Sequence, residues 1–216
     1  MNAFVSWSGG KDCLYALHRF LKKDPVHSVS ALLNMLSPEG GKSRSHGLGR
    51  EIIKAQADAV GFPILQVPVR GGYEASFKEA ILGLKERDGV DAGVFGDIYL
   101  EAHREWIERV CGELGVTPFF PLWGVSTSEL VRNFVADGYR TVIVAVRKGK
   151  LPASFLGKVI DRDFISKCEA LGLDPCGEEG EYHTFTFSGP LFKEPVNYRT
   201  GAVTEDDKHH YLEIKL

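Results

Sequence analysis

Long apolar runs are missing from this chain of 216 residues. No stretch approaches the roughly 18 to 20 apolar residues that cross a bilayer, so we expect no membrane partner. Cysteine is scarce as well: the four residues Cys13, Cys111, Cys168 and Cys176 show no CxxC spacing. The chain also lacks an opening that is typical of a secretory leader. These absences predict a reducing, cytoplasmic setting.

An excess of either charge is also missing. The chain has 26 Lys and Arg against 29 Asp and Glu, a net charge of -3. A basic surface for nucleic acid is therefore not indicated, and we expect no nucleic-acid partner. Hydrophobic residues make up 44% of the chain and charged residues 25%, which is ordinary for a globular protein that buries a core of domain size.

Short apolar runs alternate with longer amphipathic segments over the first two thirds of the chain. Strands are predicted at 3–7, 28–35, 63–69, 92–96 and 141–146. Helices are predicted at 11–23, 50–60, 74–88, 100–114 and 127–137. This alternation is typical of an α/β fold, in which helices flank a parallel sheet. We therefore expect a nucleotide-binding α/β domain over residues 1–146.

The rhythm changes from about residue 147. Residues 147–172 have a helical pattern, and the segments TFTFSGPLF and HHYLEIKL alternate like antiparallel strands. We expect residues 147–216 to form a smaller C-terminal α+β subdomain that binds the substrate. The segment at 37–50 is rich in glycine and polar residues and predicts a mobile loop.

The first strand-to-helix turn, Ser8 to Asp12, has the composition of a phosphate site. In open α/β sheets this turn is the usual phosphate cradle. Glycines let backbone N–H groups approach phosphate oxygens, and a lysine adds a full positive charge. Val5 stands where a Walker loop needs glycine, and G-x-G-x-x-G spacing fails as well. The alternative for the Gly9-Gly10 pair is ordinary turn chemistry.

A second group of polar residues lies in CGEEGEYHTF at 176–185. It places three carboxylates and a histidine in a turn with two glycines, just before a predicted strand. Neighbouring carboxylates repel one another by about 1 to 4 kcal/mol at the dielectric of a protein surface. They therefore indicate either a bound cation or amine, or simple exposure to solvent.

Together these motifs resemble the diphthine-ammonia ligase family of PP-loop ATP pyrophosphatases, the adenine nucleotide alpha hydrolase-like group. The loop resembles the signature SGGxDS, and the late motif resembles GEGGEYET. The matching segments are SGGKD at 8–12, GDI at 96–98 with Arg104 and Cys111, PLW at 121–123 and CGEEGEYHTF. The resemblance covers residues 1 to about 192 and implies a Rossmann-like (HUP-type) parallel sheet.

The resemblance also implies an activity: an ATP-dependent carboxylate-ammonia ligase. Such an enzyme adenylates a carboxylate, amidates it with ammonium and releases AMP and pyrophosphate, with ATP and Mg²⁺ as cofactors. This chain departs from the family pattern at Cys13, where serine is usual, at Glu179, where glycine is common, and at His183, where glutamate is common. The identity of the acid, free or carried on a protein, and a homodimer are left open.

Roles for individual residues follow from the resemblance and from their predicted positions. The ATP-binding candidates are Ser6, Ser8, Gly9, Gly10, Lys11, Asp12, Cys13, Leu33, Asn34 and Met35. The catalytic candidates are Lys11, Asp97, Arg104, Glu178 and Glu181. The substrate-binding candidates are His46, Asp97, Glu178, Glu179, Glu181 and His183, and Asp12 is the candidate Mg²⁺ ligand. Glu178 and Glu181 are expected to hold ammonium and to accept its proton.

Several of these residues have an alternative reading. Asp12 could support Mg²⁺ or simply favour a helix N-terminus. Asp97 follows a predicted strand, where α/β enzymes present reactive groups, but aspartate also suits an N-cap. Arg104 could stabilise an adenylate or be an exposed helical arginine, and His46 could contact the nucleotide or lie in solvent.

Two other functions compete with the ligase. One is a PP-loop enzyme that modifies tRNA, against which the missing CxxC pairs and the missing basic excess argue. The other is a sensor that binds ATP without turnover.

Overall fold

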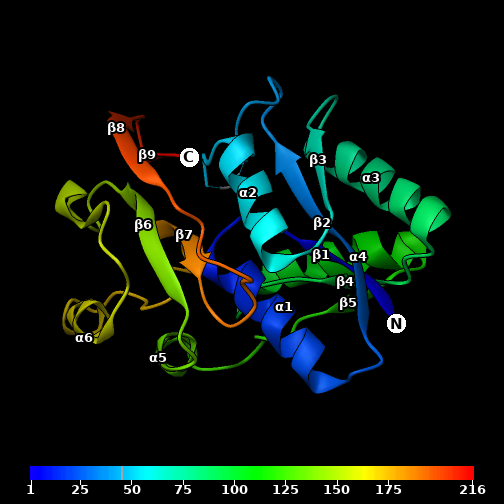
Figure 1. The fold of residues 1–216 in the computed structure, drawn as a ribbon, viewed down its shortest axis with the longest axis horizontal. Helices are drawn as coiled ribbons and strands as arrows, with labels where there is room; N and C mark the ends of the chain where they lie inside the picture. The colour runs from blue at the N-terminus through cyan, green and yellow to red at the C-terminus, as the bar shows by residue number, and fades with distance from the viewer. Residues whose placement is uncertain (45) are drawn as a thin grey trace.

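The structure, a computed structural model, describes residues 1–44 and 46–216. It contains two sheets (Figure 1). The first is parallel throughout, with the strand order β3-β2-β1-β4-β5. Its strands are β1 Asn2–Ser6, β2 Ser28–Leu36, β3 Ile64–Pro68, β4 Ala92–Val94 and β5 Thr117–Phe119. The predicted α/β class with a parallel sheet is confirmed.

Helices cover both faces of this sheet. They are α1 Lys11–Lys23, α2 Arg50–Val60, α3 Tyr73–Asp88 and α4 Glu101–Leu114. The apolar faces of α1 and α2 join one buried cluster, and those of α3 and α4 join another. Consecutive parallel strands require such crossover helices. The strand order changes direction beside β1, and ligands of open α/β sheets bind at this switch point.

The second sheet is antiparallel, with the order β7-β6-β9-β8. Its strands are β6 Arg140–Arg147, β7 Tyr182–Ser188, β8 Arg199–Glu205 and β9 His209–Lys215. The helices α5 Thr127–Ala136 and α6 Arg162–Ala170 pack against each other beside it, and a 3₁₀ turn spans Ala153–Phe155. The expected C-terminal α+β part is confirmed.

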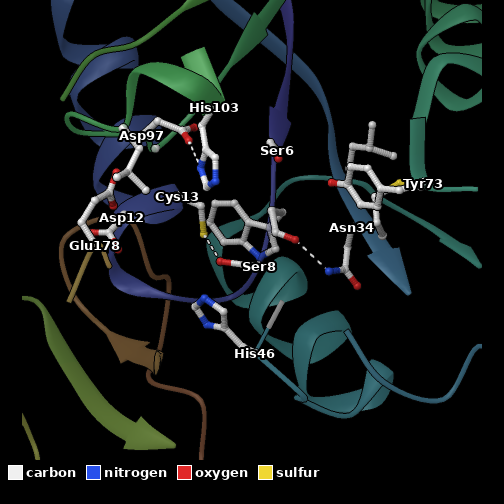
Figure 2. A pocket seen from close by; sticks show the side chains of 15 residues that line it. Ser6, Ser8, Asp12, Cys13, Asn34, His46, Tyr73, Asp97, His103 and Glu178 are labelled. Atoms are coloured by element: carbon white, nitrogen blue, oxygen red, sulfur yellow. Dashed lines mark hydrogen bonds and ion pairs between the residues drawn. The ribbon is translucent and has the colours of Figure 1, made fainter. Parts of the chain in front are cut away.

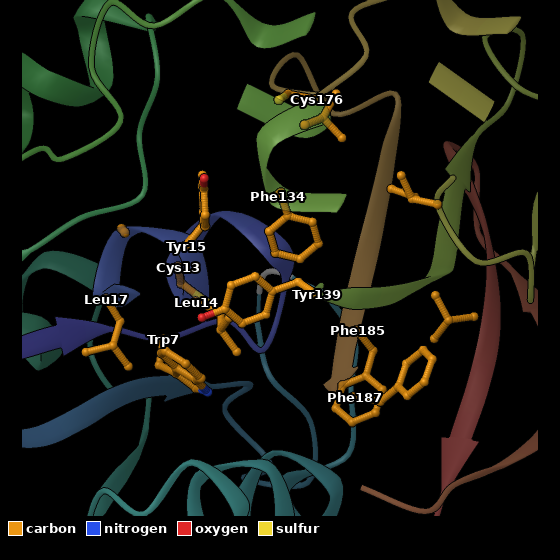
Figure 3. Packing of buried hydrophobic residues seen from close by; sticks show 14 of the residues in the cluster. Trp7, Cys13, Leu14, Tyr15, Leu17, Phe134, Tyr139, Cys176, Phe185 and Phe187 are labelled. Carbon is orange, nitrogen blue, oxygen red and sulfur yellow. The ribbon is translucent and has the colours of Figure 1, made fainter. Parts of the chain in front are cut away.

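One hydrophobic cluster joins the two sheets. Figure 3 shows Leu14 and Leu17 of α1 in the same cluster as Phe134 of α5 and Phe185 of β7. A backbone hydrogen bond from the Thr186 N–H to the Gly9 carbonyl oxygen, 3.0 Å long, adds a polar contact. The first strand-to-helix turn is therefore held directly against the second sheet.

The strand predicted at 141–146 belongs to this second sheet and not to the parallel one. Residues 141–146 are buried throughout, and most of their apolar side chains belong to the hydrophobic cluster that joins the two sheets. An apolar run of this kind is shared by buried strands of either sheet type. The chain thus passes from the first sheet to the second between β5 and β6, ahead of the predicted division at 146/147.

Two strands have no counterpart in the prediction. The strand β5 has three residues including Pro118, and β8 is largely exposed and contains Gly201. Neither has the apolar pattern of a buried strand. The helical pattern expected over 147–172 forms only as the 3₁₀ turn and α6. Within the 37–50 segment, isolated bridges pair Leu36 with Ser43 and Lys42 with Gly49.

No helix of residues 1–44 and 46–216 is long and apolar enough to cross a membrane.

Candidate functional site

A cavity of about 220 Å³ opens at the carboxyl ends of β1, β2 and β4 (Figure 2). The N-terminus of α1 borders it, which is where nucleotide phosphates bind in folds of this type. Its lining residues are Ser6, Trp7, Ser8, Asp12, Cys13, Leu33, Asn34, Met35, His46, Tyr73, Gly96, Asp97, Leu100, His103 and Glu178. Ten of the residues predicted from the sequence are brought together here: Ser6, Ser8, Asp12, Cys13, Leu33, Asn34, Met35, His46, Asp97 and Glu178.

The loop before α1 is fixed by contacts on both sides. Gly9 has a φ of 86°, a conformation that side chains rarely adopt. Its carbonyl oxygen accepts hydrogen bonds from the Thr186 N–H at 3.0 Å and from Gln56 Nε2 at 2.9 Å. The Gly10 N–H donates to Ser8 Oγ at 3.3 Å. The loop is thereby held between α2 and β7 in one shape.

Gly96 packs directly beneath this loop. A Cβ atom at residue 96 would lie 2.8 Å from the backbone carbon of Asp12 and 2.9 Å from the nitrogen of Cys13. Only glycine permits the segment that follows β4 to come this close to the first turn of α1. In the sequence analysis Gly96 was only part of the GDI motif. Its contact with the backbone of Asp12 and Cys13 depends on the fold and could not be predicted from the sequence.

Lys11 is buried, with 4% of its surface exposed. Its Nζ donates hydrogen bonds to both carboxylate oxygens of Asp12, at 2.7 and 2.9 Å, and to the carbonyl oxygen of Cys176. Burial alone would lower the pKa of Lys11, but Asp12 and the groups around Cys176 raise it above its usual range. Lys11 is therefore not a solvated lysine of the first helical turn, and its side chain is not part of the cavity lining.

The loop at 174–178 carries the acidic part of the site. The Asp174 carboxylate accepts from the N–H groups of Cys176 at 3.0 Å and Glu178 at 2.9 Å, which shapes the turn. Glu178 lines the cavity and accepts from the Ile98 N–H at 2.8 Å. Asp174 was not among the predicted residues, although an aspartate two residues before a turn N–H is a known turn signal.

Three carboxylates lie on one side of the cavity: Asp12, Asp97 and Glu178 (Figure 2). Burial, together with the charges of Asp12 and Asp97, raises the pKa of Glu178 to about 7, against the lowering effect of the Ile98 hydrogen bond and of Lys11. Burial also raises the pKa of Asp12, while Lys11 lowers it. One lysine thus faces three carboxylates, so this side of the cavity favours a further cation.

The other residues of the late motif lie away from the cavity lining. Glu181 is 3% exposed, and its Oε2 has no hydrogen-bond partner among residues 1–44 and 46–216. Glu179 is exposed, and only its carbonyl oxygen is used, accepting from Arg147 at 3.3 Å. The substrate contacts predicted for Glu179 and Glu181 stay predictions.

His46 and His183 form a stacked pair, with ring centroids 4.7 Å apart. His46 lines the cavity and its Nδ1 donates to the Thr184 carbonyl oxygen at 2.8 Å, which leaves Nε2 as an acceptor. Burial lowers the pKa of His46 to about 4 and that of His183 to about 2. Both rings are therefore neutral at pH 7, and His183 supports His46 from behind.

Asp97 lies in the cavity wall, whereas Arg104 lies outside it. Asp97 lines the cavity, and its Oδ1 lies 3.3 Å from His103 Nδ1. The residue at the N-cap of α4 is Leu100, so Asp97 is not the cap. Arg104 stacks its guanidinium 4.8 Å from the Trp123 ring centroid and pairs with Glu108 at 2.7 Å. The arginine lies outside the cavity lining, which does not support its predicted contact with an adenylate.

Asn34 and Cys13 have structural contacts inside the cavity wall. Asn34 Nδ2 donates to the Trp7 carbonyl oxygen at 2.7 Å and ties the end of β2 to that of β1. Cys13 Sγ donates to the Gly10 carbonyl oxygen at 3.3 Å and lies 3.5 Å from Ser8 Oγ. Burial raises the pKa of Cys13, so its sulfur is a thiol and not a reactive thiolate.

The described residues contain no cluster of three or more His, Cys, Asp or Glu side chains that could hold a metal ion. Both oxygens of Asp12 accept from Lys11. Mg²⁺ in nucleotide sites is commonly bound by one or two carboxylates together with substrate phosphates. These side chains therefore do not fit a resident Mg²⁺ site made of protein ligands alone.

Two models of known protein families match most of this chain. A model of the diphthamide synthase N-terminal domain matches residues 1–118, and a model of the diphthamide synthase C-terminal domain matches residues 126–216. The chain belongs to the diphthamide synthase family. The two matches divide between β5 and α5, so the diphthamide synthase C-terminal domain includes the whole second sheet.

Curated relatives of this diphthamide synthase family member are named diphthine–ammonia ligase. The protein from Rattus norvegicus is 29% identical over 88% of this chain and 79% of its own length. The one from Homo sapiens is 28% identical over the same shares, and that from Schizosaccharomyces pombe is 26% identical over 96% of this chain and 38% of its own length.

Among solved structures, a predicted subunit of tRNA methyltransferase from Methanocaldococcus jannaschii matches 91% of this chain and 100% of its own, with 15% identity and a TM-score of 0.45.

Proposed function

We propose that this member of the diphthamide synthase family is an ATP-dependent ligase. It adenylates a substrate carboxylate and amidates the adenylate with ammonia, releasing AMP and pyrophosphate. Diphthine, named in the curated relatives, is the proposed acid. The observation that carries the proposal is the cavity in which Ser8 and Asp12 of the first loop meet Asp97 and Glu178.

ATP is placed with its phosphates at the loop and its base toward Leu33 and Met35 at the end of β2. The free N–H groups and dipole of α1 favour the phosphates. Ser6 and Ser8 supply hydroxyl groups along the cavity wall. Lys11, at the start of α1, provides the positive charge nearest to the pyrophosphate that leaves. Mg²⁺ would be bound together with ATP, because phosphate oxygens would supply most of the ligands that the cavity's side chains do not.

Ammonium is placed beside Glu178. Its positive charge balances the surplus of carboxylates on this side of the cavity and would favour the ionised form of Glu178, whose pKa is otherwise raised. Glu181 of the same late motif is buried, and its Oε2 has no hydrogen-bond partner among the described residues. A buried carboxylate oxygen without a donor is costly, which supports a role for Glu181 near a cation.

The acid is placed in a neighbouring cavity of about 390 Å³. This cavity shares Ser6, Tyr73, Asp97 and His103 with the nucleotide cavity. Its remaining wall is apolar and consists of Phe77, Phe95, Trp106 and Ile107. An acid that enters here would present its carboxylate at the junction of the two cavities, where the α-phosphate lies in the proposed pose.

A cytoplasmic setting is proposed from the sequence alone, and the sequence leaves a homodimer open. The four cysteines are buried and unpaired within the described ranges, which is compatible with a reducing setting. Modification of tRNA and passive ATP sensing have less support than the ligase, because the curated relatives are named as ligases.

The proposal is tested by nitrogen incorporation. The chain is incubated with ATP, Mg²⁺, diphthine and ¹⁵N-labelled ammonium, and the product is analysed by mass spectrometry. We expect an amide that carries ¹⁵N in place of the carboxyl oxygen, formed together with AMP. AMP release that is the same with and without ammonium, and an acid that keeps its mass, would contradict the ligase.

A further inference from the structure

His103 lies at the junction of the two cavities and lines both. It belongs to the first turn of α4, and Asp97 lies in the loop that precedes this helix. Figure 2 shows the two side chains paired at the edge of the nucleotide cavity. His103 could not be selected from its sequence context, because a single histidine in a helix is usually a surface residue.

The contact with Asp97 fixes the chemistry of the imidazole. His103 Nδ1 lies 3.3 Å from Asp97 Oδ1, and a carboxylate can only accept a hydrogen bond. Nδ1 therefore carries a proton, and Nε2 is the free basic nitrogen. An imidazole held in this tautomer by a carboxylate is a common general base.

The charged surroundings of His103 favour proton uptake. Asp97 raises the pKa of His103, burial lowers it, and Glu178 raises it further from the opposite loop. Across the junction, α3 presents the Tyr73 side chain. The described lining of the two cavities includes no lysine or arginine that would oppose a proton on His103. The His103 side chain is 64% exposed, so a proton can pass from it to solvent.

We propose that His103 is the general base of the amination step, with Asp97 as its positioning residue; this rests on the proposed ligase function. Glu178 holds ammonium by charge, and His103 Nε2 takes one proton from it. The nitrogen lone pair then attacks the acyl carbon, the bond from that carbon to the AMP oxygen breaks, and AMP leaves with the bonding pair. The second proton that the nitrogen loses on forming the amide passes to solvent.

The structure favours His103 over Glu178 for this transfer. The Glu178 carboxylate accepts the Ile98 N–H and has neighbouring carboxylates, which suits it to hold a cation. His103 combines a free basic nitrogen, a carboxylate partner and access to solvent. A base that releases its proton to solvent in every cycle needs all three.

The test uses His103→Gln, with Glu105→Gln as the control on the exposed face of the same helix. With diphthine as the acid, we expect His103→Gln to lower kcat for ammonium-dependent AMP release by about 100-fold or more. ATP affinity in calorimetry and the KM for ammonium should stay near wild type. Added imidazole should restore part of the rate, because the vacated position is open to solvent. Glu105→Gln should behave as wild type.

Hydroxylamine separates amination from adenylation. It is a neutral nucleophile near pH 7, so it needs no base to form its reactive state. His103→Gln should therefore form the hydroxamate of diphthine at close to the wild-type rate. Asp97→Asn should shift the acidic limb of the kcat profile with ammonium to lower pH, because the carboxylate that raises the pKa of His103 is gone.

The outcomes separate the two proposals. If wild type is active and His103→Gln keeps its kcat with ammonium, or loses kcat equally with hydroxylamine, His103 is not the amination base, while the ligase function stands. If wild type forms neither amide nor hydroxamate, the ligase function fails, and the role of His103 fails with it.

Discussion

Replacing Lys11 with methionine is expected to abolish ATP turnover and to destabilise the fold at the same time. The substitution removes the cation between Asp12 and the carbonyl oxygen of Cys176. Leaving a buried polar group without its partner costs about 1 to 3 kcal/mol. Removing a donor that stabilises charge in the transition state costs about 100- to 1,000-fold in kcat. Calorimetric melting and AMP release measure the two effects.

The double variant Lys11→Met with Asp12→Asn separates stability from function. It removes both charges of the pair, so part of the lost stability should return. Turnover should not return, because the positive charge at the pyrophosphate is still missing. Wild-type turnover in Lys11→Met would show that the lysine only joins the loop to Cys176.

Glu178→Gln is expected to raise the KM for ammonium by about 5- to 900-fold. This range corresponds to the loss of one charge contact of about 1 to 4 kcal/mol. Glutamine keeps the size of the side chain and can still accept the Ile98 N–H. ATP affinity should stay near wild type. Steady-state kinetics with varied ammonium provide the measurement, and Glu105→Gln is the control, because residue 105 is exposed and lies outside the cavity lining.

Glu178→Gln should also change how the free energy of unfolding depends on pH. Glu178 has a pKa of about 7 in the fold, against the ordinary glutamate value of 4.5 that applies to the unfolded chain. The folded state therefore binds more protons between these values, and the free energy of unfolding falls as the pH rises from about 4.5 to about 7. Glu178→Gln removes this loss, so its melting temperature should exceed that of wild type above pH 7 and match it near pH 4. An equal difference at both values would contradict the raised pKa.

Local signals explain why so much of the parallel domain could be predicted. The strand at 3–7, the glycines at 9 and 10 and the amphipathic pattern from Lys11 onward lie in one continuous segment, and each has its own periodicity or turn chemistry. The same holds for the end of β2, since Leu33, Asn34 and Met35 close a buried run. The structure places these three positions in the cavity wall, and their predicted contact with ATP stays a prediction.

The sequence was less informative where contacts are long-range. The sheet to which β6 belongs depends on its partners β7 and β9, which lie much later in the chain. An apolar run predicts a buried strand but does not indicate which strand it pairs with. The contact of His103 with Asp97 and the close packing of Gly96 against the Asp12 backbone can be seen only in the folded structure. Arg104 lies directly after His103, yet the helical turn points it to Trp123 instead of the cavity.

The central claim is that a carboxylate attacks the α-phosphorus of ATP. It is tested most directly with diphthine labelled with ¹⁸O in its carboxyl group, incubated with ATP, Mg²⁺ and ammonium and followed by phosphorus NMR. Adenylation predicts AMP that carries one ¹⁸O on its phosphate, together with unlabelled pyrophosphate. ADP together with orthophosphate that carries the ¹⁸O would show attack at the γ-phosphorus and would contradict the account.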